Sequence, residues 1–362
     1  MGRVGITRLR TMLGQRWVGV VGTAFVIVVG IFIVVRTVDT DRVVEAIRLA
    51  DLGLLAAATG IYTLSWPLRG RRYDEILGEM DQRCGFGFLT AAVFVSQMVN
   101  LVVPARAGDG FRAYLLKSRR SVPYTTGAAS LTVERLFDLL ALVLLGTVSG
   151  MWLLATGRTF APDQTGQFLV GAGGVGSVAV VLAIVMLLGA RGQWQLTSRI
   201  RVRVERTRLS WLVESLVQFG GDLRVVVRTP NALASVGVQT LAIWVLDVLT
   251  AVLVLWAVAG TGGESVLGLL MGGTLAVTVG NLAKVLPLSQ GGIGLYEAAF
   301  TAIVVAVSPI TAATALAAAI LDHALKNGVT VAGGVGAAVL LNVSPDAVDQ
   351  ERDRPDAESS DF

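Results

Sequence analysis

Charged residues are scarce in this chain. Asp, Glu, Lys and Arg account for 15% of its 362 residues, whereas they make up about 25% of an ordinary soluble domain. Hydrophobic residues account for 54%, and the mean hydropathy is +0.69. This much apolar surface cannot be hidden in one water-soluble core, so we expect lipid to surround most of the chain. The composition excludes a soluble globular fold, a disordered chain and a nucleic-acid-binding protein.

Sulfur and imidazole ligands are also scarce. The only cysteine is Cys84 and the only histidine is His323. A single cysteine cannot form an intrachain disulfide, and these two side chains are too few to build the usual zinc or haem sites. We therefore expect neither a metal ion nor another cofactor. The net charge of +4 is less informative than the positions of the cations, because those positions set the topology of a membrane protein.

Long apolar runs predict an all-α polytopic membrane protein, because a helix of about 20 apolar residues spans a bilayer. The runs are Val18–Val35, Leu52–Leu68, Phe86–Val103, Leu131–Thr156, Phe168–Gly189, Leu233–Ala259, Val266–Leu288, Ile293–Val307 and Ile310–Leu341. We expect about six full transmembrane helices and two re-entrant, broken hairpins among them.

Proline and glycine break the apolar pattern at two places. Both breaks have the same order: an asparagine, a proline, a polar residue two positions later and a glycine two positions after that. These residues are Asn100, Pro104, Arg106 and Gly108 in the first break, and Asn281, Pro287, Ser289 and Gly291 in the second. Chance likeness between two turns is one explanation. The other is an internal repeat whose broken helices meet near the middle of the bilayer, as in transporters.

The cations support one topology. If six runs cross and each hairpin opens on one side, one face of the membrane holds most of the cations. That face includes Arg69, Arg71, Arg72 and Arg83 in one loop, whereas the opposite loops hold Arg36, Arg42, Arg48 and Arg158. The positive-inside rule places the cation-rich face and both termini in the cytoplasm. The two halves are then upside down relative to each other, which is an inverted repeat.

This topology divides the chain into segments of different composition. They are a basic cytoplasmic leader at 1–16, a transmembrane domain at 17–343 with halves at about 52–156 and about 232–342, an Arg-rich amphipathic linker at 190–231, and a disordered acidic tail at 344–362. We expect the linker to lie on the inner membrane surface and the tail to remain unfolded because of its charge.

Charged residues also lie within the apolar segments, although a charge at the centre of a membrane helix costs about 2.5–3.5 kcal/mol on insertion scales. In the first half the candidate residues are Asn100, Pro104, Arg106, Gly108, Asp109, Arg112, Glu134, Arg135 and Asp138. Guanidinium groups and the backbone N–H groups of a glycine turn together can bind a phosphate. The alternatives are that Arg106 and Asp109 pair to stabilise the bend, and that Glu134, Arg135 and Asp138 form buried ion pairs between helices.

The second half offers a similar set around its break. The candidate residues are Lys284, Ser289, Gly291, Gly292, Gly294 and Glu297. Free N–H groups at the start of the following helix favour an anion, although glycine also serves close helix packing. Asp322, His323 and Lys326 take the corresponding place in the last run and are candidates for a relay, and Asp247 is a further embedded acid. His323 either relays protons or is an ordinary packing residue.

These motifs resemble the lysylphosphatidylglycerol synthase transmembrane-region family, also called the flippase-like or UPF0104 family. The resemblance covers about residues 17–342 and rests on Asn100-x3-Pro104-x-Arg106-x-Gly108-Asp109-x2-Arg112, Ser130-x3-Glu134-Arg135-x2-Asp138 and Pro287-x-Ser289-x-Gly291-Gly292-x-Gly294-x2-Glu297. It implies an integral membrane protein that acts on anionic lipids. Some members carry a fused aminoacyl transferase or glycosyltransferase domain. The longest polar stretch here, Arg191–Arg228, is too short for a catalytic fold.

The resulting hypothesis is a lipid flippase or translocase that moves an anionic phospholipid or a polyprenyl-phosphate-linked glycan. We expect it in the cytoplasmic membrane of an archaeon or bacterium, with membrane lipids and a separate lipid-modifying transferase as partners. The alternative is a membrane-embedded subunit of such a transferase, making aminoacyl- or glycosyl-lipids, in which Glu134, Asp138 and Glu297 act as general bases. A third hypothesis is a scaffold for cell-envelope enzymes.

Overall fold

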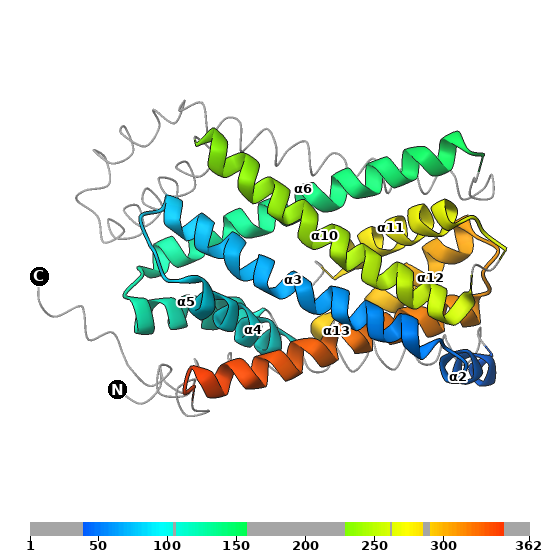
Figure 1. Ribbon diagram of the computed structural model, residues 1–362, viewed down its shortest axis with the longest axis horizontal. Coiled ribbons are helices and arrows are strands. Elements are labelled where there is room, and N and C mark those ends of the chain that lie inside the picture. The colour runs from blue at the N-terminus through cyan, green and yellow to red at the C-terminus, as the bar shows by residue number, and fades with distance from the viewer. Residues whose placement is uncertain (1–38, 104–105, 158–228, 261–262, 285–289, 344–362) are drawn as a thin grey trace, which may run out of the picture.

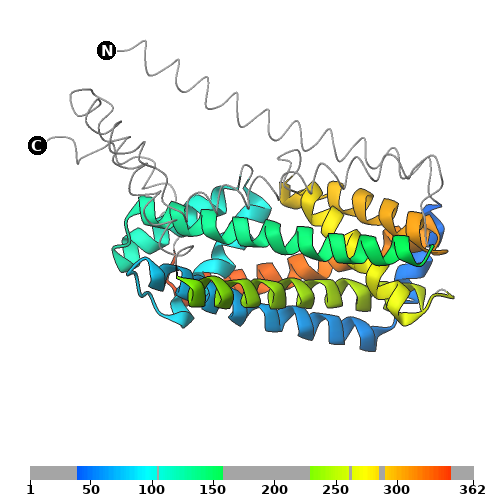
Figure 2. The same cartoon turned by 90° about the horizontal axis from the view of Figure 1, so that it is seen from above.

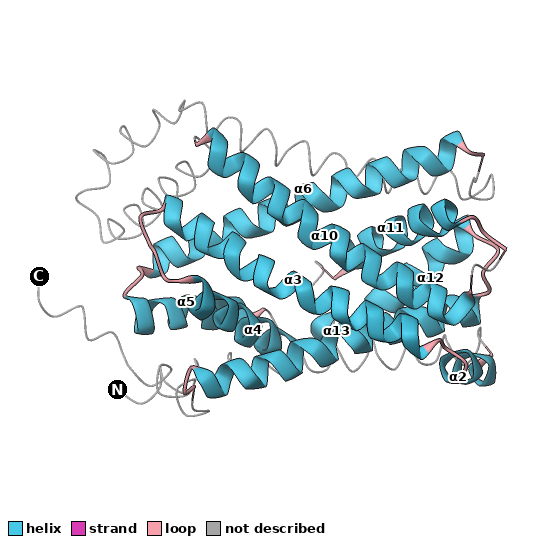
Figure 3. Ribbon diagram, in the orientation of Figure 1, coloured by secondary structure: helices cyan, strands magenta, loops and turns pink. Residues whose placement is uncertain are grey.

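The computed structural model of the chain describes residues 39–103, 106–157, 229–260, 263–284 and 290–343. Every regular element in these ranges is a helix (Figures 1 and 3). Several expected features lie outside the described residues: the leader 1–16, the runs 18–35 and 168–189, nearly all of the linker 190–231, the tail 344–362, and the side chains of Pro104 and Ser289.

The described helices fall into two groups in chain order. The first group is α2 (Thr40–Arg48), α3 (Leu52–Glu79), α4 (Phe86–Val102), α5 (Ala107–Arg120) and α6 (Tyr124–Ala155). The second is α10 (Pro230–Ala259), α11 (Val266–Ala283), the short 3₁₀ helix η1 (Gln290–Gly292), α12 (Leu295–Val307) and α13 (Ala312–Leu340). Three of these helices, α6, α10 and α11, are long and apolar enough to cross a membrane.

Polar side chains fix the start of several helices. The carboxylate of Asp51 accepts hydrogen bonds from the backbone N–H groups of Gly53 and Leu54 at the start of α3. Ser265 and Thr311 cap α11 and α13 in the same way. Such caps satisfy N–H groups that have no partner within the helix, so the local sequence specifies these ends.

Helices at the same place in the two groups run in opposite directions: α3 runs opposite to α10, and α6 runs opposite to α13 (Figure 1). α3 and α10 pack against each other antiparallel, α4 packs on α13, and α11 packs on α6. The hairpin α4–α5 therefore lies against α13, the last long helix of the second group, and the hairpin α11–α12 lies against α6, the last long helix of the first group. The hairpins α4–α5 and α11–α12 lie at opposite ends of the helix bundle, as the second view also shows (Figure 2).

Glycine allows each hairpin to close. A Cβ atom on Gly108 of α5 would lie 1.9 Å from the backbone oxygen of Ser96 in α4, and one on Gly280 of α11 would lie 2.7 Å from the ring of Tyr296 in α12. Neither distance is compatible with a side chain. The ends of the two hairpins also meet, because a Cβ atom on Gly291 would lie 3.1 Å from Leu101 at the end of α4.

Apolar clusters pack the helices together, and several of them join helices of the two groups. In the first group, Trp66 of α3 stacks on Phe94 of α4 with ring centroids 3.6 Å apart, in the same apolar cluster as the buried Leu116 of α5. In the second, Phe300 and Val304 of α12 are buried among residues of α10, α11 and α13. These cores hold the helices that carry the charged residues in fixed positions.

Candidate functional site

The first charged cluster has Arg72 of α3 at its centre. The Arg72 guanidinium donates to Asp138 Oδ1 at 2.6 Å and to Glu134 Oε1 at 2.9 Å. Because these two acids lie one turn apart on α6, one planar guanidinium reaches both. From α10, Thr240 accepts a further bond from Arg72 at 3.2 Å, and the Trp244 indole N–H donates to Asp138 at 3.1 Å. The cluster thus joins α3, α6 and α10.

The expectation that Arg72 belongs to a cytoplasmic loop is wrong. α3 does not end with its apolar run at Leu68 but continues to Glu79, and the Arg72 side chain is 0% exposed. Its neighbour Arg71 is exposed. Hydropathy misplaces Arg72 because it scores each residue alone, whereas the free energy of a buried charge depends on the partners that surround it.

Asn100 and Gly108 form the bend of the first hairpin. Asn100 Oδ1, near the end of α4, accepts a hydrogen bond from the Gly108 N–H at 2.8 Å, and Asn100 Nδ2 donates to Asp109 Oδ1 at 3.2 Å. Arg106, directly before α5, adopts the left-handed conformation with a φ of 55°. One asparagine therefore ties the start of α5 to the end of α4.

Two further arginines connect this bend to α6. Arg112 of α5 is fully buried, and its Nη1 lies 2.6 Å from Glu134 Oε2. Arg135 Nη2 lies 3.0 Å from Asp109 Oδ1. Glu134 thus uses one carboxylate oxygen for Arg112 and the other for Arg72. Such multiple contacts are what a buried charge needs to offset its loss of hydration.

Arg106 differs from the other arginines of this cluster. It is exposed, and no carboxylate in the described part of the chain pairs with it. The alternative in which Arg106 pairs with Asp109 is wrong, because Asp109 pairs with Arg135 and lies 3.8 Å from Arg112. The paired groups balance, because three arginines (Arg72, Arg112 and Arg135) meet three acids (Asp109, Glu134 and Asp138). Arg106, which lies within electrostatic range of Arg135 and Asp109, therefore adds one surplus positive charge to the cluster.

The second charged cluster has Lys326 of α13 at its centre. Lys326 Nζ lies 2.9 Å from Asp247 Oδ2 of α10 and 3.1 Å from Asp322 Oδ1, one turn earlier on α13. The Tyr296 hydroxyl of α12 donates to Asp322 Oδ2 at 2.5 Å. All four side chains are buried. Asp247 lies three positions after Trp244 on α10, so neighbouring turns of one helix contact both clusters.

The second break is fastened to α13 by His323. Its Nδ1 lies 2.6 Å from Glu297 Oε1, and its Nε2 lies 3.2 Å from the backbone oxygen of Gly291. Glu297 Oε2 in turn accepts a hydrogen bond from the Gly294 N–H at 2.7 Å. The backbone is left-handed at Gly291 and Gly292, with φ of 61° and 78°, a conformation that favours glycine.

Lys284 ends α11 at this break. Its ammonium lies 4.4 Å from the centroid of the Tyr296 ring, a cation–π distance. Gly292 leaves room for its stem, because a Cβ atom there would lie 2.2 Å from Lys284 Cγ. Within the described ranges no carboxylate pairs with Lys284, so each break presents one cation without an acidic partner: Arg106 in the first and Lys284 in the second.

The two clusters occupy equivalent positions in the two halves. Four pairs correspond by their place in the helix: Glu134 with Asp322, Arg135 with His323, Asp138 with Lys326, and Asp109 with Glu297. In each half, the third residue of the second hairpin helix is bonded to the side chain 26 positions later. The first half uses a guanidinium for this contact and the second half an imidazole.

Four contributors have no signal in the local sequence: Arg72, Thr240, Trp244 and Tyr296. Each reaches its cluster only because α3, α10 or α12 packs beside α6 or α13. Their partners lie far away in the chain, for example 168 positions between Arg72 and Thr240 and 106 between Trp244 and Asp138.

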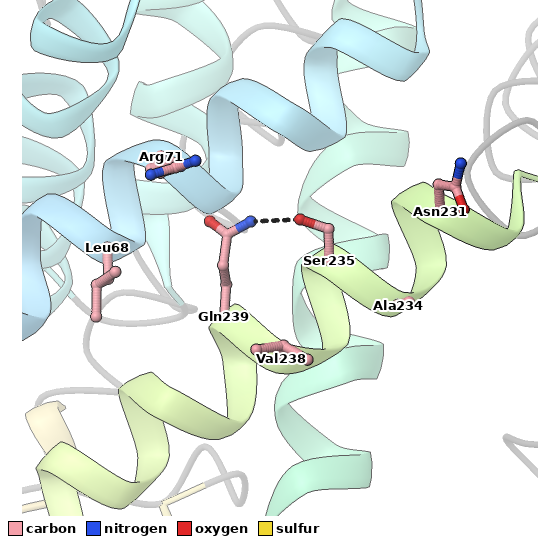
Figure 4. Close-up of a pocket in the computed structure, with 7 residues that line it drawn as sticks. All are labelled: Leu68, Arg71, Asn231, Ala234, Ser235, Val238 and Gln239. Carbon is pink, nitrogen blue, oxygen red and sulfur yellow. Dashed lines mark hydrogen bonds between the residues drawn. The ribbon is translucent and has the colours of Figure 1, made fainter.

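A groove lies between α3 and α10, the two helices that supply Arg72 and Thr240 to the first cluster (Figure 4). It has a volume of about 440 Å³ and is lined by Leu68, Arg71, Asn231, Ala234, Ser235, Val238 and Gln239. Arg71 and Gln239 each directly adjoin a residue of the first cluster in sequence, Arg72 and Thr240, but their own side chains line the groove. The groove is therefore separate from the buried charges.

Comparison with known proteins gives two kinds of similarity. The family described as lysylphosphatidylglycerol synthase TM region matches residues 19–334. A Haloferax volcanii protein named glycosyltransferase AglD is 44% identical over an alignment of 348 positions that covers 91% of this chain and 55% of that protein. A UPF0104 membrane protein of Methanothermobacter thermautotrophicus is 26% identical over an alignment of 307 positions that covers 79% of this chain and 82% of that protein. The chain thus spans about half the length of the Haloferax relative.

Proposed function

Because the chain belongs to the family of the lysylphosphatidylglycerol synthase transmembrane region, we propose that it moves an anionic lipid between the two leaflets of the cytoplasmic membrane. The cargo is a phospholipid or a polyprenyl-phosphate-linked glycan, both of which present a phosphate. The chain is a multi-pass membrane protein with helices long and apolar enough to span the bilayer, so its polar breaks are available to a headgroup inside the membrane.

The surplus positive charge of the first cluster carries this proposal. Arg72, Arg112 and Arg135 already have carboxylate partners, whereas Arg106 is exposed at the end of a hairpin beside the start of α5. A guanidinium next to the N–H groups of a helix start is a good phosphate ligand. The buried ion pairs then act as the frame that positions Arg106.

The two groups of helices support alternating access. Their hairpins lie at opposite ends of the bundle (Figure 1), and the breaks contact each other between η1 and α4. In the proposed topology six segments cross the membrane, the two hairpins enter from opposite sides, and both termini and the linker 190–231 are cytoplasmic. The halves at about 52–156 and about 232–342 then move against each other around a headgroup near the middle of the bilayer.

A second candidate function follows from the relative named glycosyltransferase AglD, of which this chain spans 55%. In this alternative the chain is a membrane-embedded subunit that presents a lipid to a separate transferase. Formation of a glycosylated or aminoacylated lipid by the purified chain together with an activated sugar or aminoacyl donor would support it, whereas movement of unmodified lipid without any donor supports the translocase.

The test uses the full chain in vesicles that contain fluorescent phosphatidylglycerol in the inner leaflet. A quencher that cannot cross the membrane reports the fraction that reaches the outer leaflet. We expect movement with the wild type and with Arg71→Ala, whose exposed side chain lines the groove between α3 and α10, and a loss of movement with Arg106→Ala. Lipid that stays in its leaflet with folded wild type contradicts the function. Equal rates for the two variants contradict the site.

A further inference from the structure

His323 makes two contacts that one neutral imidazole cannot make as hydrogen bonds. It is 4% exposed, its Nδ1 lies 2.6 Å from Glu297 Oε1, and its Nε2 lies 3.2 Å from the Gly291 backbone oxygen. A carboxylate and a carbonyl are both acceptors. A neutral imidazole has one N–H donor and one lone pair, so one of its nitrogens would face an oxygen lone pair at hydrogen-bond distance.

We infer that the Glu297–His323 pair is a proton-binding site, and that the bound proton fastens the second break to α13. With this proton the imidazole donates from both nitrogens, one bond to Glu297 and one to Gly291. The proton comes from water and returns to water, and no other reactant is needed. When it leaves, one of the two bonds is lost.

Several helices present titratable or charged groups around the pair. α10 presents Asp247, α11 presents Lys284, α12 presents Tyr296 and Glu297, α13 presents Asp322 and Lys326, and α3 presents Tyr62. The two other helices that pack on α13 add no charge beside His323. α4 carries no titratable side chain, and α2 contacts α13 near the start of that helix, at Ala313. α3 also carries Arg69, whose charge acts on Asp247 and Tyr62. Among these groups, Glu297 is the carboxylate that contacts the His323 imidazole directly.

The equivalent contact in the first half shows why a histidine here matters. There Arg135 holds Asp109, also 26 positions earlier, and a guanidinium keeps its charge at any physiological pH. Histidine changes its charge near neutral pH. The two halves thus share one contact between a carboxylate and a cationic side chain. Only in the second half does the charge of that side chain depend on a bound proton.

Through the hydrogen bond to Gly291, the proton on His323 affects the position of the second break. Gly291 lies in η1, which packs on Leu101 at the end of α4, so His323 holds the place where the two hairpins meet. A neutral imidazole keeps its N–H for the closer, charged Glu297 and loses the hydrogen bond to Gly291. The effect on lipid movement rests on the function proposed above, whereas the proton site rests on the geometry alone.

The first experiment observes the proton directly. Because the chain contains a single histidine, ¹⁵N-histidine labelling of the full chain, purified with a histidine-free tag and placed in phosphatidylglycerol/phosphatidylcholine bilayers, gives the NMR signals of one imidazole. At pH 7 we expect two protonated ring nitrogens in the wild type and in Asp109→Asn, the matching change in the first half. In Glu297→Gln we expect one, because an amide NH₂ can donate to a neutral imidazole. A wild type with one protonated nitrogen at pH 7 overturns the inference without any variant.

The second experiment measures lipid movement in vesicles with a pH difference across the membrane. We expect the wild-type rate to respond to the sign of the difference, and His323→Arg, which carries the permanent charge of the first half, to lose this response. A neutral imidazole together with lipid movement overturns the proton site alone. A protonated imidazole without lipid movement under any condition contradicts the proposed function alone. Lipid movement that ignores the pH difference in the wild type overturns the coupling.

Discussion

Arg71 and Arg72 are neighbours in α3, yet Arg71 is exposed and Arg72 is fully buried. Consecutive residues of a helix point about 100° apart, which turns Arg72 toward the acids of α6 and Arg71 toward the groove between α3 and α10 (Figure 4). The same helix therefore carries one arginine that organises the first cluster and one that does not. Substituting each of the two arginines in turn therefore compares the contribution of a buried and of an exposed charge to the free energy of unfolding.

We expect Arg72→Met to lower the free energy of unfolding by about 3–5 kcal/mol, because it leaves Glu134 and Asp138 without their shared partner in a buried place. Arg71→Met should change it by at most about 0.5 kcal/mol, as for other exposed sites. Denaturant unfolding in mixed micelles measures both values. Similar stabilities of the two variants would show that Arg72 is hydrated rather than paired.

The two glycines at the start of α5 make a second matched pair. Gly108→Ala should cost about 1–3 kcal/mol of stability through overpacking, because its Cβ atom meets the backbone oxygen of Ser96 at 1.9 Å. Gly110→Ala has no atom within 4 Å of its Cβ and should be neutral or stabilising by up to about 1 kcal/mol. Thermal unfolding measures the difference. A Gly108→Ala protein as stable as Gly110→Ala would mean that α4 and α5 do not approach closely.

Arg135→Ala tests the contact that positions the first break. The variant removes the bonds from Arg135 to Asp109, and charge-assisted hydrogen bonds are worth about 1.5–3 kcal/mol. We therefore expect lipid movement to slow by roughly tenfold to a hundredfold. Arg201→Ala, in the linker, should keep the wild-type rate. If both variants move lipid equally fast, the Arg135–Asp109 pair does not position the site.

The Asp247–Lys326 pair should show strong energetic coupling. Asp247→Asn and Lys326→Met each leave a buried charged partner behind, whereas the double variant leaves only Asp322 to be compensated. Contacting residues in one network usually couple by about 0.5–3 kcal/mol, and the 2.9 Å contact places this pair in that class. A double-mutant cycle of unfolding free energies measures the coupling. Additive effects would show that the two side chains do not interact.

The local sequence was sufficient for the helices and the breaks. Apolar runs predict α4, α10 and α12 to within a few residues of their observed bounds, because helix formation and membrane insertion depend on residues that are close in the chain. The likeness between the breaks at Asn100 and Asn281 predicts two similar hairpins. The acids Glu134 and Asp138 are expected on one face of a helix from their spacing alone.

The partners of the site residues were not available from the sequence. Hydropathy places Arg72 in a loop, and no pattern connects it with Glu134, 62 positions away. Asp247 and Lys326, 79 positions apart, are likewise two isolated charges until α10 packs on α13. The role of His323 also depends on a contact that only packing creates, since Glu297 lies on another helix.

The sequence by itself thus determined that this chain is helical, belongs in lipid and carries charges at two breaks, because apolarity and helical period are properties of short segments. Only the tertiary structure decided which of those charges neutralise each other and that Arg106 and Lys284 are left without a carboxylate in the described ranges. The reason is physical: a buried charge is stabilised by its three-dimensional neighbours, and those neighbours come from helices that are distant in the chain.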